Sequence, residues 1–364
     1  MNIHHDSNPD NQHPSRTERD CNSGPLARLK LLGVRHPVMQ AGMSNASGPM
    51  LAGTVSAAGG IGTLGLHDVS VWEKAIEQTK AQALGRPIGV NLLLPCTRAK
   101  HVDTVIRQQV PIATLFWGDG TQLIRQLQRQ GVFVFQQVGS RLEAERALDV
   151  GVDGLIVQGI EAGGHVRAQQ RLDVLLPEIA GLTSTIPIFA AGGIYTGEDA
   201  GHAIRIGAHG VCTGTRFLLT PESNIHDEYR DRLIAADSTI LTHLFGFGWP
   251  DLHRVVPNQA TTRWCREDGS IPAWLQLLNS AFSFTRKIVP MKAGIVAAQK
   301  PGIPFFSPAL LSRGLPAQLA DATALYAGEH IGRIRSLRPA AEIVKELAGG
   351  IAACKDHATQ EIEK

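Results

Sequence analysis

A histidine at the end of a glycine-rich stretch is the residue of this sequence best suited to move a proton. The stretch is Gln158-Gly-Ile-Glu-Ala-Gly-Gly-His165, and it follows a short apolar run. A neutral imidazole takes up and releases protons near neutral pH, and glycines let the backbone turn sharply before it. We therefore predict that His165 is the catalytic base on a flexible loop. Most of the other histidines lie on predicted helices, in the N-terminal tail or in a later Trp-rich segment, and we expect them at the surface.

Two further glycine-rich segments could hold a phosphate. They are Ala190-Ala-Gly-Gly-Ile194 and Cys212-Thr-Gly-Thr215, and each ends an apolar run. Glycine lets backbone N–H groups approach phosphate oxygens, and the N-terminus of a following helix adds a favourable dipole. Each segment alone is equally well explained as a tight turn. Together they favour a phosphate site made by Gly192, Gly193, Cys212, Thr213, Gly214 and Thr215.

Amide side chains stand at other strand ends. Gln40-Ala-Gly-Met43, Asn91 and Gln158 each follow or close an apolar run. Asn and Gln both donate and accept hydrogen bonds, which suits the edge of a flavin or a similar ring. Ordinary polar residues at strand ends explain each of them equally well when taken singly.

Eight short apolar runs alternate with amphipathic stretches, a pattern typical of βα units around a parallel sheet. The runs are 37–41, 60–65, 87–94, 112–118, 132–138, 153–159, 186–192 and 210–215, and helices are predicted at 47–58, 69–83, 120–130, 141–150 and 197–206. Barrel enzymes place their active sites at the carboxyl ends of the strands, and commonly hold phosphate after strands seven and eight. We predict an α/β fold, a (β/α)8 TIM barrel, although an open doubly wound sheet is also compatible with the pattern.

One motif invites a different interpretation. Gly60-Ile-Gly-Thr-Leu-Gly65 has the G-x-G-x-x-G spacing of dinucleotide-binding folds. That fingerprint should follow a strand and open a helix. Here it follows a helical stretch and is itself a predicted strand, so we reject it as an NAD site.

The chain divides into five predicted segments. They are a disordered polar tail (1–26), the barrel (27–239), a cap inserted after the eighth strand (240–312), C-terminal helices packing on the barrel (313–350) and a second tail (351–364). Helical periodicity is expected over 315–349, with Pro339 near a helix start. We expect Phe245, Trp249 and Trp274 of the cap to contribute to the substrate pocket.

Composition narrows the class of protein. The formal net charge is +2 with both signs interspersed, so no surface for nucleic acid or an anionic membrane is indicated. The five cysteines show no CxxC spacing, which disfavours a disulfide framework or a zinc site, and no metal is expected. No apolar run approaches the roughly 20 residues of a membrane span. We expect a cytoplasmic enzyme.

Six motifs in this order resemble the nitronate monooxygenase (2-nitropropane dioxygenase-like) family, with similarity over about 30–348. They are 37–43, 57–62, 89–92, 158–165, 190–194 and 214–217. The resemblance implies a TIM barrel with non-covalent FMN, an oxidoreductase that converts an alkyl nitronate and O₂ into a carbonyl compound and nitrite, and His165 as the base. It implies cofactor contacts at Ala41, Gly42, Met43, Asn91, Gln158, Gly163, Gly164, Gly192, Gly193 and Cys212 to Thr215. Gly42 stands where the family usually has proline, and Val166-Arg167 follow the histidine where a glycine is common.

Two alternatives stay open. The same superfamily includes FMN-dependent enoyl-thioester reductases that use NAD(P)H, some acting in trans on fatty-acid or polyketide assembly lines. A barrel that binds a flavin or phosphate ligand without turnover is the second, and His165 disfavours it. A barrel of the IMP-dehydrogenase type is less compatible, because no cysteine follows the sixth strand. The oligomeric state is left open.

Overall fold

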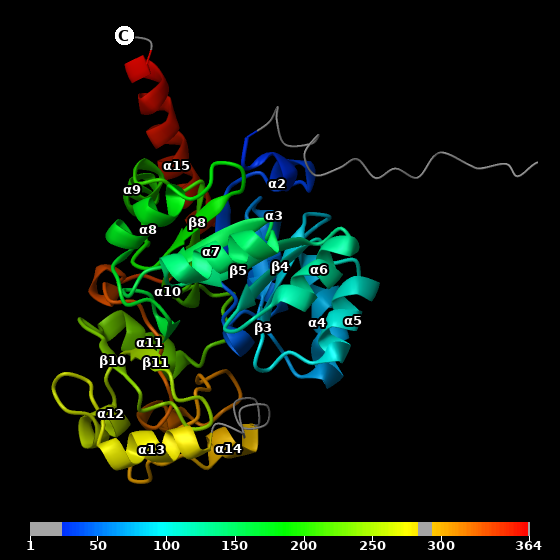
Figure 1. Ribbon diagram of the computed structural model, residues 1–364. Coiled ribbons are helices and arrows are strands. Elements are labelled where there is room, and N and C mark those ends of the chain that lie inside the picture. The colour runs from blue at the N-terminus through cyan, green and yellow to red at the C-terminus, as the bar shows by residue number, and fades with distance from the viewer. Residues whose placement is uncertain (1–23, 283–292, 363–364) are drawn as a thin grey trace, which may run out of the picture.

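The computed structural model describes residues 24–282 and 293–362 and confirms the predicted closed barrel (Figure 1). The parallel strands are β1 (Val38–Gln40), β2 (Ile61–Leu64), β3 (Ile88–Leu93), β4 (Ile112–Phe116), β5 (Phe133–Val138), β6 (Gly154–Gln158), β8 (Ile188–Ala191) and β9 (Gly210–Thr213). Each lies within one of the eight predicted runs. The last strand pairs back with the first, Cys212 beside Met39, which rules out an open sheet.

Helices connect the strands and cover the barrel from outside. They are α3 (Pro49–Ala57), α4 (Val69–Gln82), α5 (Ala99–Arg107), α6 (Thr121–Arg129), α7 (Arg141–Val150), α8 (Leu172–Ala180), α9 (Gly197–Arg205) and the short α10 (Thr215–Leu218). Local sequence explains their ends. In α7, the Ser140 hydroxyl accepts a bond from the Glu143 N–H at the first turn, and Gly151 ends the helix at φ +83°.

The G-x-G-x-x-G segment forms strand β2, as predicted, and its glycines serve packing. A Cβ on Gly62 would lie 1.6 Å from the carbonyl oxygen of Ala52 in α3. Glycine is therefore required for the strand and the helix to approach each other, which explains the motif without a dinucleotide.

The barrel interior is apolar and is closed at one end by a short helix, α2 (Ala27–Leu31). Buried side chains of the strands, among them Phe133, Phe135 and Phe189, pack together with Leu29 of α2. Figure 1 shows α2 at the end of the barrel opposite the cap with α12 (Gln259–Trp264), α13 (Ala273–Ala281) and α14 (Ala293–Ala297). The interior is thus a packed core, and only the opposite end is available for a site.

Asp153 ties this closed end together, and its loss should destabilise the fold. Its buried carboxylate accepts bonds from the Val134 N–H (2.9 Å) and the Gln128 amide (2.9 Å) and pairs with Arg28. We expect Asp153→Ala to lower the free energy of unfolding by about 2 kcal/mol, because a buried N–H loses its acceptor. Urea unfolding measures this. Asp149→Ala, at an exposed site, should change it by less than about 0.5 kcal/mol, and equal effects would contradict the assignment.

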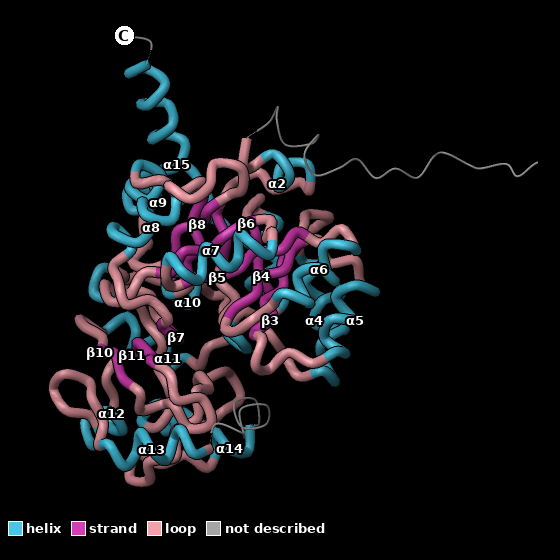
Figure 2. Tube along the Cα trace, in the orientation of Figure 1, coloured by secondary structure: helices cyan, strands magenta, loops and turns pink. Residues whose placement is uncertain are grey.

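The cap lies over the carboxyl ends of the strands and contains most of the structure after α10. Helix α11 (Asp227–Ala235) precedes it, and the cap includes β10 (Ile240–Thr242), β11 (Leu252–Val255), α12 (Gln259–Trp264), α13 (Ala273–Ala281) and α14 (Ala293–Ala297). An additional strand, β7 (Gly164–Val166), leaves the barrel and pairs antiparallel with β11, with His165 opposite His253 (Figure 2). The end of the glycine-rich segment, Gly164 and His165, is therefore held in a small sheet between barrel and cap, whereas a flexible loop was expected.

The C-terminal part differs from the prediction. Residues 315–339 were expected to be helical, but they hold only two 3-10 turns, Ala317–Asp321 and Ile331–Arg333. The long helix α15 (Ala340–Ile362) begins directly after Pro339, as expected, and then continues through the predicted tail. It packs on α9 through two glycines, since a Cβ on Gly350 would lie 1.8 Å from the Gly197 carbonyl oxygen. Of the predicted N-terminal tail, residues 1–23 lie outside the described residues, and the division into domains stays a prediction.

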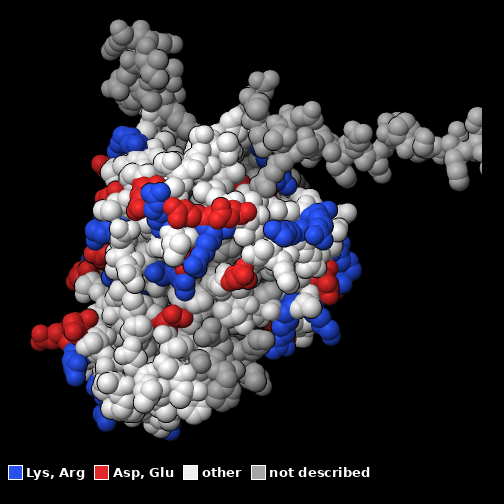
Figure 3. All heavy atoms as spheres, in the orientation of Figure 1, with Lys and Arg blue, Asp and Glu red and all other residues white. Residues whose placement is uncertain are grey.

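Charged side chains are unevenly distributed over the surface. On the face shown in Figure 3 they gather over the barrel helices, whereas the surface over α12 to α14 is mostly uncharged. Within the described part of the chain, no helix combines the length and the apolar character needed to cross a bilayer.

Candidate functional site

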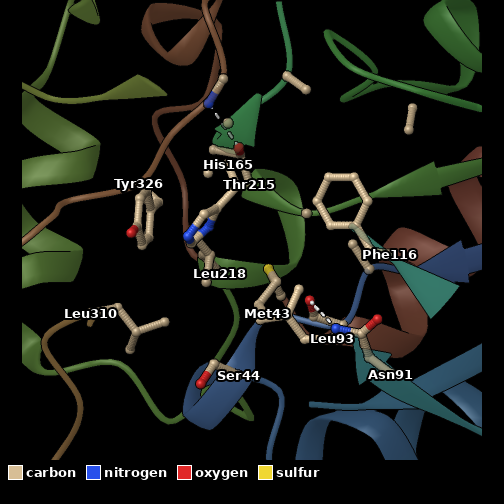
Figure 4. A pocket seen from close by; sticks show the side chains of 18 of the residues that line it. Met43, Ser44, Asn91, Leu93, Phe116, His165, Thr215, Leu218, Leu310 and Tyr326 are labelled. Atoms are coloured by element: carbon tan, nitrogen blue, oxygen red, sulfur yellow. Dashed lines mark hydrogen bonds between the residues drawn. The ribbon is translucent and has the colours of Figure 1, made fainter. Parts of the chain in front are cut away.

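A cavity of about 460 Å³ lies at the carboxyl ends of the barrel strands, beneath the cap. Every cofactor or catalytic residue predicted from the sequence lines it: Ala41, Gly42, Met43, Asn91, Gln158, Gly163, Gly164, His165, Gly192, Gly193, Cys212, Thr213, Gly214 and Thr215. In Figure 4 the His165 imidazole projects between Tyr326 on the cap side and Met43 on the barrel side. The fold thus brings together residues that are up to 174 positions apart, from Ala41 to Thr215.

The loop after β1 is held by two polar side chains. The Ser47 hydroxyl accepts a bond from the Met43 N–H (2.8 Å) and donates to the Ala41 carbonyl oxygen (3.1 Å). The Gln40 amide donates to Ser47 (2.8 Å) and accepts from the Thr63 N–H (3.2 Å). Gln40, at a strand end, therefore shapes this loop from behind and does not face the cavity.

Gly42 is in close contact with Asn91 on the neighbouring strand β3. A Cβ on Gly42 would lie 2.2 Å from the Asn91 Cβ. The Thr114 hydroxyl donates to the Asn91 Oδ1 (3.0 Å), so the amide is also held from the next strand. A side chain at position 42 would therefore displace Asn91 from its place in this structure.

Gln158 serves the backbone of β7. Its Nε2 donates to the His165 carbonyl oxygen (3.0 Å), and its Oε1 accepts from the Arg167 N–H (2.9 Å). Both ends of the amide are thus engaged on either side of Val166. Gln158 lines the cavity, but its amide is already hydrogen-bonded at both ends to the backbone of the strand that carries His165. Its observed role is therefore to hold that strand and not to bind a flavin ring.

The segment after β8 has an unusual backbone. Gly192 and Gly193 adopt φ values of +116° and +68°, which side chains other than glycine rarely tolerate. The neighbouring helix α9 is closed by its own residues: the Asp199 carboxylate accepts bonds from the Tyr195 and Thr196 N–H groups, both at 2.9 Å. The glycine pair can approach an anion, but the expected contribution of a free α9 N-terminus is absent, because Asp199 occupies it.

Gly163, Gly164 and Thr215 connect the barrel to the segment that follows Tyr326 and to strand β7. Gly163 packs on the segment after Tyr326, since its Cβ would lie 2.5 Å from the Ala327 carbonyl carbon, and Gly164 enters β7 at φ +83°. The Thr215 hydroxyl accepts a bond from the Gly328 N–H (2.9 Å).

At the floor of the cavity, two predicted residues are buried and uncharged. Burial raises the pKa of the Cys212 thiol to about 12, so this cysteine is not a nucleophile at neutral pH. The buried Thr213 hydroxyl has no hydrogen-bond partner within the described part of the protein. Buried hydroxyls are normally satisfied, so this one is available to a ligand.

His165 is surrounded by aromatic rings. Its ring centroid lies 4.5 Å from that of His253, 4.6 Å from Trp249, 5.6 Å from Tyr326 and 6.0 Å from Trp117. Its Nε2 is buried and, among the described residues, without a hydrogen-bond partner. Burial lowers the pKa of His165 to about 4. The imidazole is therefore neutral at physiological pH and able to accept a proton.

Sequence reasoning missed several members of this group. His253 was expected at the surface with the other histidines, yet it is fully buried, as is His101, and burial holds the pKa of His253 well below its ordinary value. Of the cap side chains expected in the pocket, Trp249 lines it, whereas Phe245 packs in the cap core and Trp274 is exposed. Nothing local marks His253, because its burial comes from the β7–β11 pairing.

The low pKa of His165 predicts a loss of stability in acid. The unfolded chain binds a proton below about pH 6.5, but the folded site does so only near pH 4, so protons favour the unfolded state as the pH falls through this window. We expect up to about 2 kcal/mol less stability at pH 5 than at pH 7 from His165. Urea unfolding of wild type and His165→Asn at both pH values tests this. Between pH 7 and pH 5 the variant should lose less free energy of unfolding than the wild type. His253 contributes a loss of the same sign in both proteins. Identical losses in the two proteins would contradict a neutral His165 in the folded state.

Comparison with known proteins agrees with this architecture. The chain matches the nitronate monooxygenase family over residues 27–114 and 96–350. It is 36% identical over 235 residues to the (3aS,4S,5R,7aS)-5-hydroxy-7a-methyl-1-oxo-octahydro-1H-indene-4-carboxyl-CoA dehydrogenase of Rhodococcus jostii, covering 63% of this chain and 65% of that protein. It is 28% identical over 308 residues to a probable nitronate monooxygenase of Staphylococcus aureus, covering 71% of this chain and 85% of the relative.

A solved structure with the same fold is FabK from Thermotoga maritima. The TM-score is 0.71 with 24% identity, covering 91% of this chain and 97% of that one, which establishes the shared fold. The chain spans less than two thirds of the carboxyl-CoA dehydrogenase, so that protein's substrate does not transfer directly. The barrel, the cavity at its strand ends and the family match across nearly the whole described chain lead to one conclusion: this protein belongs to the nitronate monooxygenase family of flavin-dependent oxidoreductases.

Proposed function

We propose that this protein is an FMN-dependent oxidoreductase that acts on an acyl thioester at the carbon beside the carbonyl, with His165 exchanging the proton. The observation that carries the substrate class is the neutral imidazole of His165, with its Nε2 out of reach of solvent, in a largely apolar cavity. The relative named as a carboxyl-CoA dehydrogenase, at 36% identity, supports a thioester.

The charges that line the cavity favour a neutral thioester over an anionic nitronate as substrate. Among the described residues, Arg313 is the only lysine or arginine lining the cavity, and it is exposed. The cavity would already hold the anionic phosphate of FMN, and adding a nitronate, a second anion, without a paired cation is costly. A thioester is neutral before its proton leaves, and an apolar acyl group suits the walls made by Leu93, Phe116, Leu218, Val296 and Leu310.

The cavity suits FMN. Gly192 and Gly193 form a backbone cradle without side chains, and Gly214 presents bare backbone to the cavity, where an added Cβ would lie 3.5 Å from the Met43 Sδ. The Thr213 hydroxyl at the end of β9, next to Gly214, is buried and has no partner among the described residues. We assign the phosphate to these residues, and the ring to the loop Ala41 to Met43 and to Asn91. FMN, when bound, supplies the acceptor or donor of two electrons.

The chain's own residues would handle the proton and the water. His165 takes a proton from the carbon beside the thioester carbonyl in dehydrogenation, or returns it in the reverse direction. The rings of Trp249 and Tyr326 keep water from the imidazole, which strengthens its interaction with the developing negative charge. Gln158 holds the histidine strand in register while the proton moves.

Nitronate oxidation with O₂ is the second candidate. The family match over residues 27–350 and the relative named as a probable nitronate monooxygenase favour it. In that reaction a neutral His165 would remove the carbon-bound proton of a nitroalkane, so the same base would serve a different carbon acid.

Anaerobic spectroscopy distinguishes the candidates. The purified yellow protein is mixed separately with a saturated acyl-CoA, with an alkyl nitronate and with NADPH, and the flavin absorbance is followed. The proposal expects rapid bleaching by the acyl-CoA, or bleaching by NADPH followed by recovery with an enoyl-CoA. Bleaching by the nitronate alone, with nitrite formed when O₂ returns, would replace the thioester by the nitronate as substrate.

A further inference from the structure

Trp117 has a backbone conformation that a bulky residue rarely adopts. It follows β4 with φ +71°, in the left-handed region, and Gly118 follows at φ +124°. Strained positions of this kind persist only where surrounding contacts hold them, and they cluster at functional sites. The contacts of the Trp117 side chain therefore indicate what the strain serves.

The indole is almost fully buried and meets His165 edge-on. The ring centroids are 6.0 Å apart with an interplanar angle of 75°. On another side it meets the Trp249 ring at 5.5 Å, and the Arg167 guanidinium lies over it at 5.0 Å. Trp117 thus joins the end of a barrel strand, the cap and the strand that bears the histidine.

Arg167 is itself anchored by neighbouring elements. Its N–H donates to Gln158 at the end of β6, and its Nε donates to the Glu143 carboxylate on α7 (2.6 Å). Gly139 allows the close approach, since a Cβ there would lie 2.7 Å from the Arg167 Cβ. The Arg167 guanidinium is therefore held over the indole from a fixed position.

We propose that Trp117 is a positioning residue for His165, and that Arg167 acts through it. The strained strand end and the guanidinium hold the indole against the imidazole, so that the histidine keeps one orientation and water does not reach it. This inference rests on the assignment of His165 as the reactive base, but not on whether the substrate is a thioester or a nitronate.

Two titratable side chains have rings close to that of His165, and neither belongs to the strand end that carries Trp117. His253 faces the imidazole from β11 and Tyr326 from the segment before the second 3-10 turn, and both are buried. The Arg167 charge lies beyond the indole and is paired with Glu143. Removing the indole would let water reach the imidazole from the side of Trp117, while the Arg167 charge stays paired with Glu143.

The test compares Trp117→Phe and Trp117→Ala in the flavin-loaded enzyme and in its flavin-free form. Trp117→Ala should keep its flavin and lose roughly 10- to 100-fold in kcat with little change in KM, because a misplaced base affects the chemical step. Trp117→Phe should recover most of the loss. In the flavin-free protein, the NMR pH titration of the His165 ring should move by about one unit or more toward the ordinary histidine value in Trp117→Ala.

Two controls make the test decisive. Trp274→Ala removes an exposed tryptophan of α13, and Arg141→Gln breaks an ion pair with Glu145 on the surface of α7. Neither control should change the pH titration of the His165 ring. Arg167→Gln should move this titration in the same direction as Trp117→Ala, but less, and it provides the test if Trp117→Ala does not fold. An unmoved His165 titration in Trp117→Ala, or in Arg167→Gln where the alanine variant does not fold, would overturn the proposal. Because the titration needs no substrate, it is independent of the thioester assignment.

Discussion

Replacing His165 by asparagine is expected to leave the flavin bound and to lower kcat/KM by roughly 10²–10⁴-fold, the contribution commonly made by a positioned acid–base group. The loss should be confined to chemistry, because the bonds that hold β7 use main-chain atoms. Gln158 binds the carbonyl oxygen of residue 165, and β7 pairs with β11 through the backbone. Steady-state kinetics with the carbon acid identified by anaerobic bleaching measures the effect.

A second histidine provides the control for this substitution. His202→Asn removes a partly exposed imidazole that bonds to Asp173 on the outer surface, at 3.0 Å. It should leave kcat/KM within about twofold, as expected for a surface change. If His165→Asn also kept kcat/KM within that range, His165 would not be the base, whatever the substrate.

Gly214→Glu is expected to yield colourless protein, whereas Gly214→Ala should remain yellow. The position has an ordinary φ, and an added Cβ would meet only the Met43 Sδ at 3.5 Å and the Ala41 Cβ at 3.8 Å, so a methyl group fits. A carboxylate would enter the proposed phosphate site with the same charge as the ligand. Flavin affinity should fall at least about tenfold, since a like-charge contact in a poorly solvated site exceeds 1.4 kcal/mol.

The ratio of flavin to protein absorbance measures occupancy, and thermal unfolding shows whether the variant is folded. Gly349→Glu places the same charge at an exposed glycine of α15 with nothing within 4 Å, and should keep full occupancy. Full flavin in a folded Gly214→Glu protein would show that the phosphate is not bound at the end of β9.

Most of the barrel could be predicted from the sequence, because its information is local. Each strand is a short apolar run, and helices end at glycines such as Gly151 with positive φ. The C-terminal segment was harder. Residues 315–339 show helical periodicity, but they form irregular structure packed against Tyr229 and Ile225, where tertiary contacts satisfy the apolar side chains without a helix.

The sequence by itself determined which strand-end residues meet in the cavity, since parallel strands present their carboxyl ends at one rim, but not that Tyr326 lines it as well. Only the tertiary structure decided how His165 is held. Its strand pairs with a cap strand 88 positions later, opposite His253, and Trp117 reaches it from a backbone conformation that no residue pattern marks. Such contacts depend on how separate elements pack, and local periodicity and propensity carry no record of that packing.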